Sequence, residues 1–302
     1  MNVLVAGGTG FIGSVLCREL HDRGHDVVAM SRNPDASAVP TGVSVVDGDV
    51  TEPATLEEPV AGMDAVVNFV SPSPLFQTPK GISHRSVHRD GTANLVAAAT
   101  AAGVDRFVQI SGLGADPDGK TAFLRAKGEA EAIVRESSLE WVIVRPSVVF
   151  GDGEEFTPFV AKTTLPIVSA LPAGGRTRFQ PIWVEDFAPM LADCVEDDRY
   201  VGGTYEIGGK DRLTLADVTR MYYESRGQRV SVLPVPMALS KLGLTLAGPI
   251  PFVPFGREQA RSLTFDNTTD DNDVEAFGVD PAQLRSYESY LNERAAPVAS
   301  TP

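Results

Sequence analysis

The chain has 302 residues, 43% of them hydrophobic, which is enough to bury a large core and excludes a disordered chain. Its formal net charge is −14, because 40 acidic residues stand against 26 basic ones. Such a surface would repel a phosphate backbone, so the composition argues against a nucleic-acid partner.

Short β-branched runs alternate with helical patterns through the first half of the chain. The runs predict strands at Val3–Ala6, Asp26–Met30, Val43–Val46, Ala65–Val70, Arg106–Ile110 and Trp141–Val144, with helices near Phe11–Arg23, Ser86–Ala102 and Ala122–Ser137. Strands that are apolar at nearly every position and separated by helices indicate a parallel sheet covered on both faces. We therefore predict a doubly wound α/β fold of the Rossmann type.

After Gly151 proline and glycine become frequent and the alternation is lost. A helix at Ile182–Cys194 and a strand at Thr204–Ile207 should return to the main sheet. We predict a dinucleotide-binding domain formed by residues 1–150 and 182–209, a smaller C-terminal lobe formed by residues 151–181 and 210–296, and a frayed tail at 297–302.

Targeting and redox signals are weak in this sequence. Neither a basic leader nor a long apolar stretch precedes Asn2, so we expect a cytoplasmic protein, with attachment to the inner face of the membrane left open. Leu242–Phe255 is strongly apolar but contains three prolines and is too short to span a bilayer. We expect a buried or ligand-facing loop there, with contact to a bilayer or an apolar partner as the alternative. Cys17 and Cys194 lack a CxxC partner and should be reduced core thiols.

A glycine-rich turn follows the first predicted strand. Its residues are Gly7, Gly8, Thr9, Gly10, Phe11, Ile12 and Gly13. Gly7 permits the tight turn, Gly10 lets the backbone approach a pyrophosphate, and Gly13 lets the helix pack on the strand. The N-terminus of the helix then supplies free N–H groups and a positive dipole to the phosphates. The turn predicts a dinucleotide site.

The end of the second strand distinguishes the two nicotinamide cofactors. An acidic residue there would repel a 2′-phosphate, but this strand continues into Ser31 and Arg32, which offer a hydroxyl and a planar fork of donors. We therefore expect NADP(H) ahead of NAD(H). Asp49 and Val50 should lie beside the adenine, although Asp49 could equally serve as a turn or N-cap residue.

Five further segments, in order along the chain, resemble landmarks of the extended and atypical short-chain dehydrogenase/reductase family. They are Val67–Val70, Asp90–Leu95, Ile110–Ala115, Arg145–Gly151 and Gln180–Asp186. Within this family the chain looks most like the nucleotide-binding accessory subunit of respiratory complex I and its stand-alone prokaryotic relatives, over nearly residues 1–291. The resemblance implies that Asn68, Lys127 and Pro146 also contact the cofactor. It leaves open a small-molecule or quinone-like ligand and a respiratory-complex partner.

Active members of the family use a Ser, a Tyr and a Lys, with Tyr and Lys four residues apart on one helix. In this chain Ser111 matches the serine and Lys127 the lysine, whereas the tyrosine position holds Phe123. A phenyl ring has no proton to transfer, so the usual acid/base step cannot occur there. Lys127 keeps a role, because its ammonium can bind the ribose hydroxyls or itself transfer a proton.

Two functional classes remain. In the first, the chain holds NADP(H) for structure, sensing or support of a redox complex; in the second, it is a reductase or epimerase that uses Lys127, Ser111 or a residue of the smaller lobe, such as Tyr222 or Tyr223.

The low number of Lys and the high number of acidic residues resemble the composition of salt-loving archaeal proteins. His84 and His88 should share a helix face but have no obvious third ligand, so we expect surface or cavity-mouth histidines and no metal.

Overall fold

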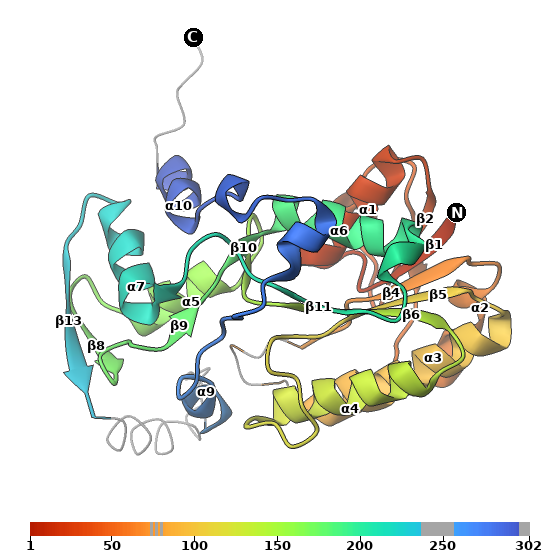
Figure 1. Ribbon diagram of the computed structural model, residues 1–302, viewed down its shortest axis with the longest axis horizontal. Helices are drawn as coiled ribbons and strands as arrows, with labels where there is room; N and C mark the ends of the chain where they lie inside the picture. The colour runs from red at the N-terminus through yellow and green to blue at the C-terminus, as the bar shows by residue number, and fades with distance from the viewer. Residues whose placement is uncertain (73–74, 76–77, 79–80, 237–256, 296–302) are drawn as a thin grey trace, which may run out of the picture.

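The computed structural model describes residues 1–72, 75, 78, 81–236 and 257–295. Its centre is a seven-stranded sheet in the order β11-β6-β5-β4-β1-β2-β3, in which all neighbouring strands are parallel (Figure 1). The strands are β1 (Asn2–Ala6), β2 (Asp26–Ser31), β3 (Ser44–Asp47), β4 (Ala65–Asn68), β5 (Arg106–Ile110), β6 (Glu140–Pro146) and β11 (Thr204–Ile207). The order reverses between β1 and β4, which is where doubly wound sheets bind ligands.

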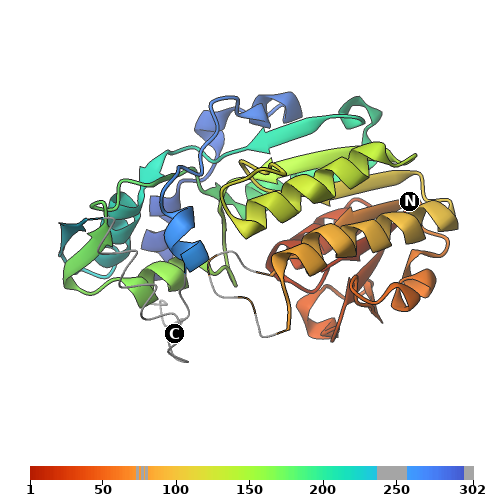
Figure 2. The same cartoon turned by 90° about the horizontal axis from the view of Figure 1, so that it is seen from below.

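Helices cover both faces of the sheet. They are α1 (Phe11–Asp22) and α6 (Val184–Glu196) on one face, and α2 (Glu57–Val60), α3 (Gly91–Ala102) and α4 (Ala122–Glu136) on the other. Successive residues of β1 point to opposite faces, so Val3 and Val5 pack with α1 and α6 while Leu4 packs with α3. Figure 2, which views the molecule from below, shows α3 and α4 side by side in front of the sheet. Burial on both faces explains why these strands are continuous apolar runs.

A second lobe lies beyond the carboxyl ends of the strands. Its elements are β7 (Val149–Phe150), α5 (Phe156–Thr163), β8 (Ile167–Pro172), β9 (Arg178–Phe179), β10 (Ile182–Trp183), β12 (Leu213–Thr214), α7 (Leu215–Glu224), β13 (Val230–Val235), α9 (Arg257–Ser262) and α10 (Tyr287–Ala295). Strand pairs β10–β7, β12–β9 and β13–β8 form three small sheets. Phe150, Phe156, Leu171 and Tyr287 belong to the separate hydrophobic core of this lobe.

Short helical turns link these elements. They are η1 (Ala36–Ala38), η2 (Pro53–Thr55), η3 (Arg85–Asp90), η4 (Asp198–Tyr200), η5 (Asp273–Phe277) and η6 (Pro281–Gln283). Of these, η5 packs Val274 and Phe277 into the core between the sheet and α6, so a late segment of the chain supports the main sheet. The division into two domains at the predicted boundaries stays a prediction.

The doubly wound parallel sheet is confirmed. Most predicted element ends are shifted by one or two residues, and three of the differences lie close to the predicted site. The strand expected over Ala65–Val70 ends at Asn68, because the Asn68 side chain accepts a hydrogen bond from the Val70 amide (3.2 Å) and turns the chain. The helix expected from Ser86 begins as a π-helical turn. The one expected from Ile182 begins at Val184, because Ile182 and Trp183 pair with β7 instead.

Two further sequence features can be placed or set aside. Cys17 and Cys194 are buried free thiols, as predicted, and burial raises the pKa of Cys17 to about 12. The apolar segment Leu242–Phe255 and the tail at 297–302 lie outside the described residues. Among the residues that are described, no helix is both long and apolar enough to cross a bilayer.

Candidate functional site

The turn after β1 has the geometry that close backbone approach requires. Gly7 has a φ of +84°, in the left-handed region that favours glycine. A Cβ on Gly13 would lie 2.3 Å from the carbonyl oxygen of Gly7, and one on Gly8 would lie 2.7 Å from the Cβ of Ala29. The helix α1 therefore starts directly against the strand end, and its first N–H groups face the space above β1.

This turn is fastened to the end of β2. The amides of Gly7 and Gly8 both donate to the carbonyl oxygen of Met30, at 2.8 and 3.2 Å. The hydroxyls of Thr9 and Ser31 lie 2.8 Å apart and hydrogen-bond to each other. Arg32 follows directly and is exposed. The two segments predicted to hold the phosphates and the 2′-position thus form one surface.

Asp49, Val50 and Asn68, which were predicted to contact the cofactor, each bind or pack against other residues of the protein. Asp49 makes a turn, since its Oδ1 accepts from the amide and hydroxyl of Thr51 at 2.8 and 2.7 Å. Val50 is 2% exposed and belongs to the core beneath the sheet. The Asn68 amide donates to Thr92 and to Gln109, at 3.1 and 3.0 Å. Their part in cofactor binding stays a prediction.

A cavity of about 530 Å³ extends from the glycine turn to the second lobe. Nine of the residues singled out in the sequence line it: Gly7, Gly10, Phe11, Ile12, Gly13, Ser111, Phe123, Lys127 and Pro146. Six others lie outside this lining: Thr9, Ser31, Arg32, Asp49, Val50 and Asn68. The cavity runs over the carboxyl ends of β1, β4, β5 and β6, at the reversal of strand order.

The ring of Phe123 packs against two histidine side chains. The imidazoles of His84 and His88 stack on each other with centroids 5.5 Å apart, and each meets the Phe123 ring edge to face, at 5.6 and 5.2 Å. His84 lines the cavity, as expected for a mouth residue, whereas His88 is 1% exposed. The prediction that His88 lies at the surface or the cavity mouth is therefore wrong, because η3 turns it toward α4. Burial lowers the pKa of both imidazoles, and Lys127 lowers it further.

Lys127 is the one lysine or arginine that lines the cavity among the described residues. It projects from α4, is 2% exposed, and donates from Nζ to the carbonyl oxygen of Ile110 at 2.7 Å. Burial lowers its pKa to about 7, although the nearby Glu131 carboxylate opposes this shift. Near neutral pH the side chain can therefore either hold a proton or release it, as proton transfer requires.

Ser111 stands at the end of β5, directly after Ile110. Its side chain is 6% exposed and lines the cavity, and its Oγ has no hydrogen-bond partner within the described part of the chain. A buried hydroxyl without a partner costs free energy, so its presence marks a position where a bound molecule can supply the partner.

Sequence reasoning missed the wall that the second lobe contributes. Phe156, Phe159 and Phe179 line the cavity there, and Asn267 ties this wall to β6 by accepting from the hydroxyl of Ser147 at 2.8 Å. The available signal was that the family resemblance, which covers nearly residues 1–291, includes Asn267. Tyr222 and Tyr223 lie on α7 and are not among the described residues that line the cavity.

The sequence raised His84 and His88 as possible metal ligands. No group of three or more His, Cys, Asp or Glu side chains within the described ranges could hold a metal ion. His84 and His88 share a face, as the sequence predicted, but they stack on each other and enclose a phenyl ring. The cavity is largely apolar, and its lining also includes the ammonium of Lys127, the unpartnered hydroxyl of Ser111, the His84 imidazole and the carboxylates of Glu155 and Glu258.

Known proteins resemble the chain along nearly its whole length. It is 27% identical to subunit 9 of the NADH dehydrogenase [ubiquinone] 1 alpha subcomplex of Arabidopsis thaliana, over 94% of this chain and 75% of that protein. It is 26% identical to the photosystem II assembly factor Ycf39 of Synechocystis, over 97% and 90%. A UDP-glucose 4-epimerase of Thermus thermophilus, solved with NAD, superimposes with a TM-score of 0.70 at 20% identity and 98% coverage of both chains.

The last of these similarities shows the fold alone, since its identity is low. A family described as NAD(P)H-binding matches residues 7–200, which include the glycine turn, Ser111, Lys127 and all strands of the central sheet except β1 and β11. The chain therefore belongs to the NAD(P)H-binding family, among relatives of the atypical short-chain dehydrogenase/reductase type.

Proposed function

We propose that the protein binds NADP(H) and holds it without the phenol-dependent reaction, as a structural, sensing or redox-complex-associated nucleotide binder. The observation that carries this proposal is Phe123. Its ring occupies the place four residues before Lys127 and is enclosed by two imidazoles, so no phenol reaches the cavity from α4. General acid/base catalysis typically contributes ~10² to 10⁴-fold in rate, and a site without its donor is correspondingly slow.

Two of the relatives support the same class. One is named as a subunit of NADH dehydrogenase and the other as an assembly factor of photosystem II, so both names refer to a larger complex. A dinucleotide bound in the cavity would stabilise the fold and could report the redox state to such a complex. We place this protein, by analogy, in the cytoplasm or at the inner face of the membrane.

The cofactor preference follows from Arg32. Its exposed guanidinium, next to the hydroxyl pair of Thr9 and Ser31, can form a charge-assisted fork with a 2′-phosphate. We expect Arg32→Ala to weaken NADPH binding roughly 10-fold or more and to leave NADH binding unchanged, because a charged hydrogen bond contributes about 1.5–3 kcal/mol. Calorimetric titration of both cofactors measures this, and equal losses for both would contradict the assignment.

A reductase that depends on Lys127 is the second candidate. It is favoured by one observation: Lys127 has a pKa lowered to about 7 and faces a cavity that continues past the glycine turn into an aromatic chamber. There the ammonium could deliver the proton that follows hydride transfer to a carbonyl substrate.

Turnover separates the two candidates. We expect the wild type to bind NADPH and to oxidise it negligibly with aldehydes, ketones and quinones. The loss of absorbance at 340 nm measures this oxidation. Phe123→Tyr should raise the rate, because the phenol would stand beside Lys127 and its pKa would be lowered. Phe123→Leu is the matched control, since it also alters the ring but adds no hydroxyl.

The opposite outcome is equally clear. Brisk oxidation by the wild type that disappears in Lys127→Ala, while NADPH binding persists, would replace the first proposal with the lysine-dependent reductase. No binding of either dinucleotide by the folded wild type would contradict both.

A further inference from the structure

Charge is distributed unevenly along this acidic chain. Residues 156–184 and 225–257 contain seven Lys or Arg and not one Asp or Glu, so all 40 acidic residues lie elsewhere. In a chain of net charge −14 these two stretches are locally cationic. They are far apart in sequence, so only the fold decides whether they form one surface.

The fold brings them together. Strand β8 comes from the first stretch and β13 from the second, and they pair in parallel from Ile167 opposite Val230 to Pro172 opposite Val235. Figure 1 shows this two-stranded ribbon at the outer edge of the second lobe, at the far end of the molecule from β1 and β2. The described parts of the two stretches therefore meet at one pole.

The same ribbon carries exposed apolar side chains. Five large hydrophobic residues are strongly exposed in the described part of the chain, and four of them lie here: Leu165 (69%), Ile167 (76%), Val168 (43%) and Leu233 (52%). Val168 and Leu233 lie on the outward face, because Ser169 and Leu171 of the same ribbon point inward and are buried. Ile167 has a φ of +73°, which is rare for a β-branched residue and which accompanies its outward position.

Cationic side chains flank these apolar ones. The carbonyl oxygen of Arg229 accepts from the Ile167 amide at 3.2 Å, so Arg229 lies next to the patch. Arg226 precedes it on the same turn, with its guanidinium 3.8 Å from the centre of the Tyr222 ring. Both are exposed, and neither pairs with a carboxylate of the described residues. Their charge is thus available to a partner.

We propose that this surface, formed by Leu165, Ile167, Val168, Leu233, Arg226 and Arg229, docks the protein onto an anionic lipid bilayer. The apolar side chains would enter the boundary of the acyl chains while the two guanidinium groups remain at the level of the lipid phosphates. Because all acidic residues lie outside the two stretches, a negative membrane favours this pole over the rest of the molecule.

Charge also argues against a second copy as the occupant. Two such poles facing each other would bring like charges together, on molecules that already carry −14 each. A bilayer, in contrast, supplies both the negative charge and the apolar medium on one flat surface, and it needs no matching groove. This inference does not depend on which reaction, if any, the cavity supports.

Vesicle cosedimentation of the full chain tests the proposal. Vesicles of phosphatidylglycerol are compared with vesicles of phosphatidylcholine, at the lowest salt at which circular dichroism shows the protein folded. We expect binding to phosphatidylglycerol at least 10-fold tighter than to phosphatidylcholine, and weaker as salt rises. The double variants Val168→Ser with Leu233→Ser, and Arg226→Glu with Arg229→Glu, should each lower the affinity about 10-fold or more.

Arg199→Glu is the matched control for charge. Its side chain is 76% exposed and lies in η4. Asp198 of η4 pairs with Arg106 at the start of β5, so η4 lies at the amino ends of the strands, away from the second lobe. It should leave vesicle binding unchanged, and unchanged NADPH binding would show that all variants fold. The proposal is overturned if the wild type does not sediment with phosphatidylglycerol vesicles, or if the patch variants bind them as the wild type does. A dimer in gel filtration that the Val168/Leu233 variant abolishes, without vesicle binding by the wild type, would instead assign this surface to a second copy.

Discussion

At the scale of single residues, the buried ammonium of Lys127 dominates the site. Burial keeps its pKa near 7 in the folded chain, against an ordinary value of 10.5. Between these two values the unfolded chain binds one more proton than the folded chain does at this residue. Its contribution to stability therefore rises as the pH rises from about 7 to 10.5, and below pH 7 it is constant and unfavourable.

The direction of this pH dependence predicts the effect of Lys127→Met on stability. The variant should be more stable than the wild type at pH 7 by about 1–3 kcal/mol, because it removes a buried charge, and the difference should shrink toward pH 10. Urea unfolding of the two proteins without dinucleotide, at several pH values, measures it. A difference that is independent of pH would show that the lysine is not desolvated as its 2% exposure implies.

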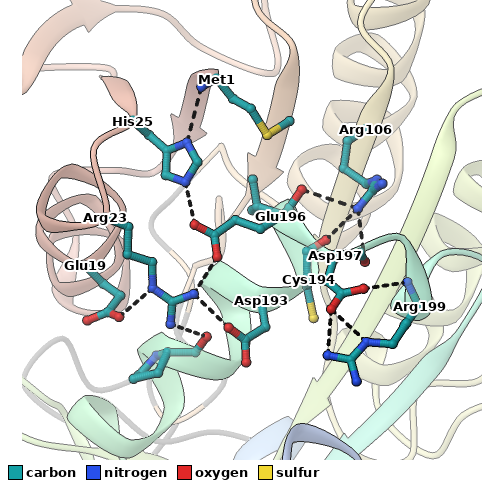
Figure 3. A network of polar contacts seen from close by, with 12 residues as sticks. Met1, Glu19, Arg23, His25, Arg106, Asp193, Cys194, Glu196, Asp197 and Arg199 are labelled. Atoms are coloured by element: carbon teal, nitrogen blue, oxygen red, sulfur yellow. Dashed lines mark hydrogen bonds and ion pairs between the residues drawn. The ribbon is translucent and has the colours of Figure 1, made fainter.

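At the scale of elements, a polar clasp joins α1 to α6 on one face of the sheet (Figure 3). The Arg23 guanidinium, at the end of α1, donates to Asp193 and Glu196 of α6 at 2.7 and 2.6 Å and to Glu19 of its own helix at 2.8 Å. His25 lies 2.6 Å from the other oxygen of Glu196. These polar contacts lie at the edge of the interface between α1 and α6, and the interior of that interface is apolar.

We expect Arg23→Gln to lower the free energy of unfolding by about 1 kcal/mol, since the pairs are partly exposed but form a network. Arg18→Gln is the matched control, because Arg18 also links α1 to α6 but through one exposed pair with Glu185. It should cost less. Equal urea midpoints for the wild type and Arg23→Gln would show that the clasp adds nothing to the apolar contacts of the two helices.

Acid should open the same clasp. Burial by itself would raise the pKa of Glu196, but the hydrogen bonds from His25 and Arg23 outweigh it and hold the pKa below the usual 4.5. A lowered carboxyl pKa contributes stability that is present above the usual value and is lost as the pH falls through the lowered one. The difference between wild type and Arg23→Gln should therefore shrink as the pH falls below 4.5 and vanish once the pH lies below the lowered pKa of Glu196.

At the scale of the whole molecule, the net charge of −14 sets the response to salt. Mutual repulsion of the acidic residues opposes the compact state, and salt screens it. We expect the melting temperature to rise from low to molar concentrations of KCl and NaCl alike. A flat or falling curve would remove the proposed adaptation to high salt and leave the fold unaffected, since the core of the sheet is apolar.

Local sequence was sufficient for the parts of the fold that local chemistry controls. Apolar runs separated by helical patterns predicted the parallel sheet, because strands buried on both faces cannot alternate. The turn at Gly7 and Gly13 was predicted for the same kind of reason: its conformation depends on residues within one turn of each other, and the positive φ at Gly7 and the 2.3 Å approach at Gly13 agree with it. The boundary at Val184 was missed because pairing with the distant strand β7 set it. The boundary at Asn68 was missed because a hydrogen bond from the Val70 amide to the Asn68 side chain ends the strand.

The sequence by itself thus determined the sheet, the glycine turn and the replacement of tyrosine by Phe123. Only the tertiary structure decided what surrounds them. The burial of Lys127, the packing of His84 and His88 against Phe123 and the aromatic wall from the second lobe depend on contacts between segments far apart in the chain. The cationic and apolar pole of β8 and β13 has the same origin, because two distant acid-free stretches become one surface only when the strands pair.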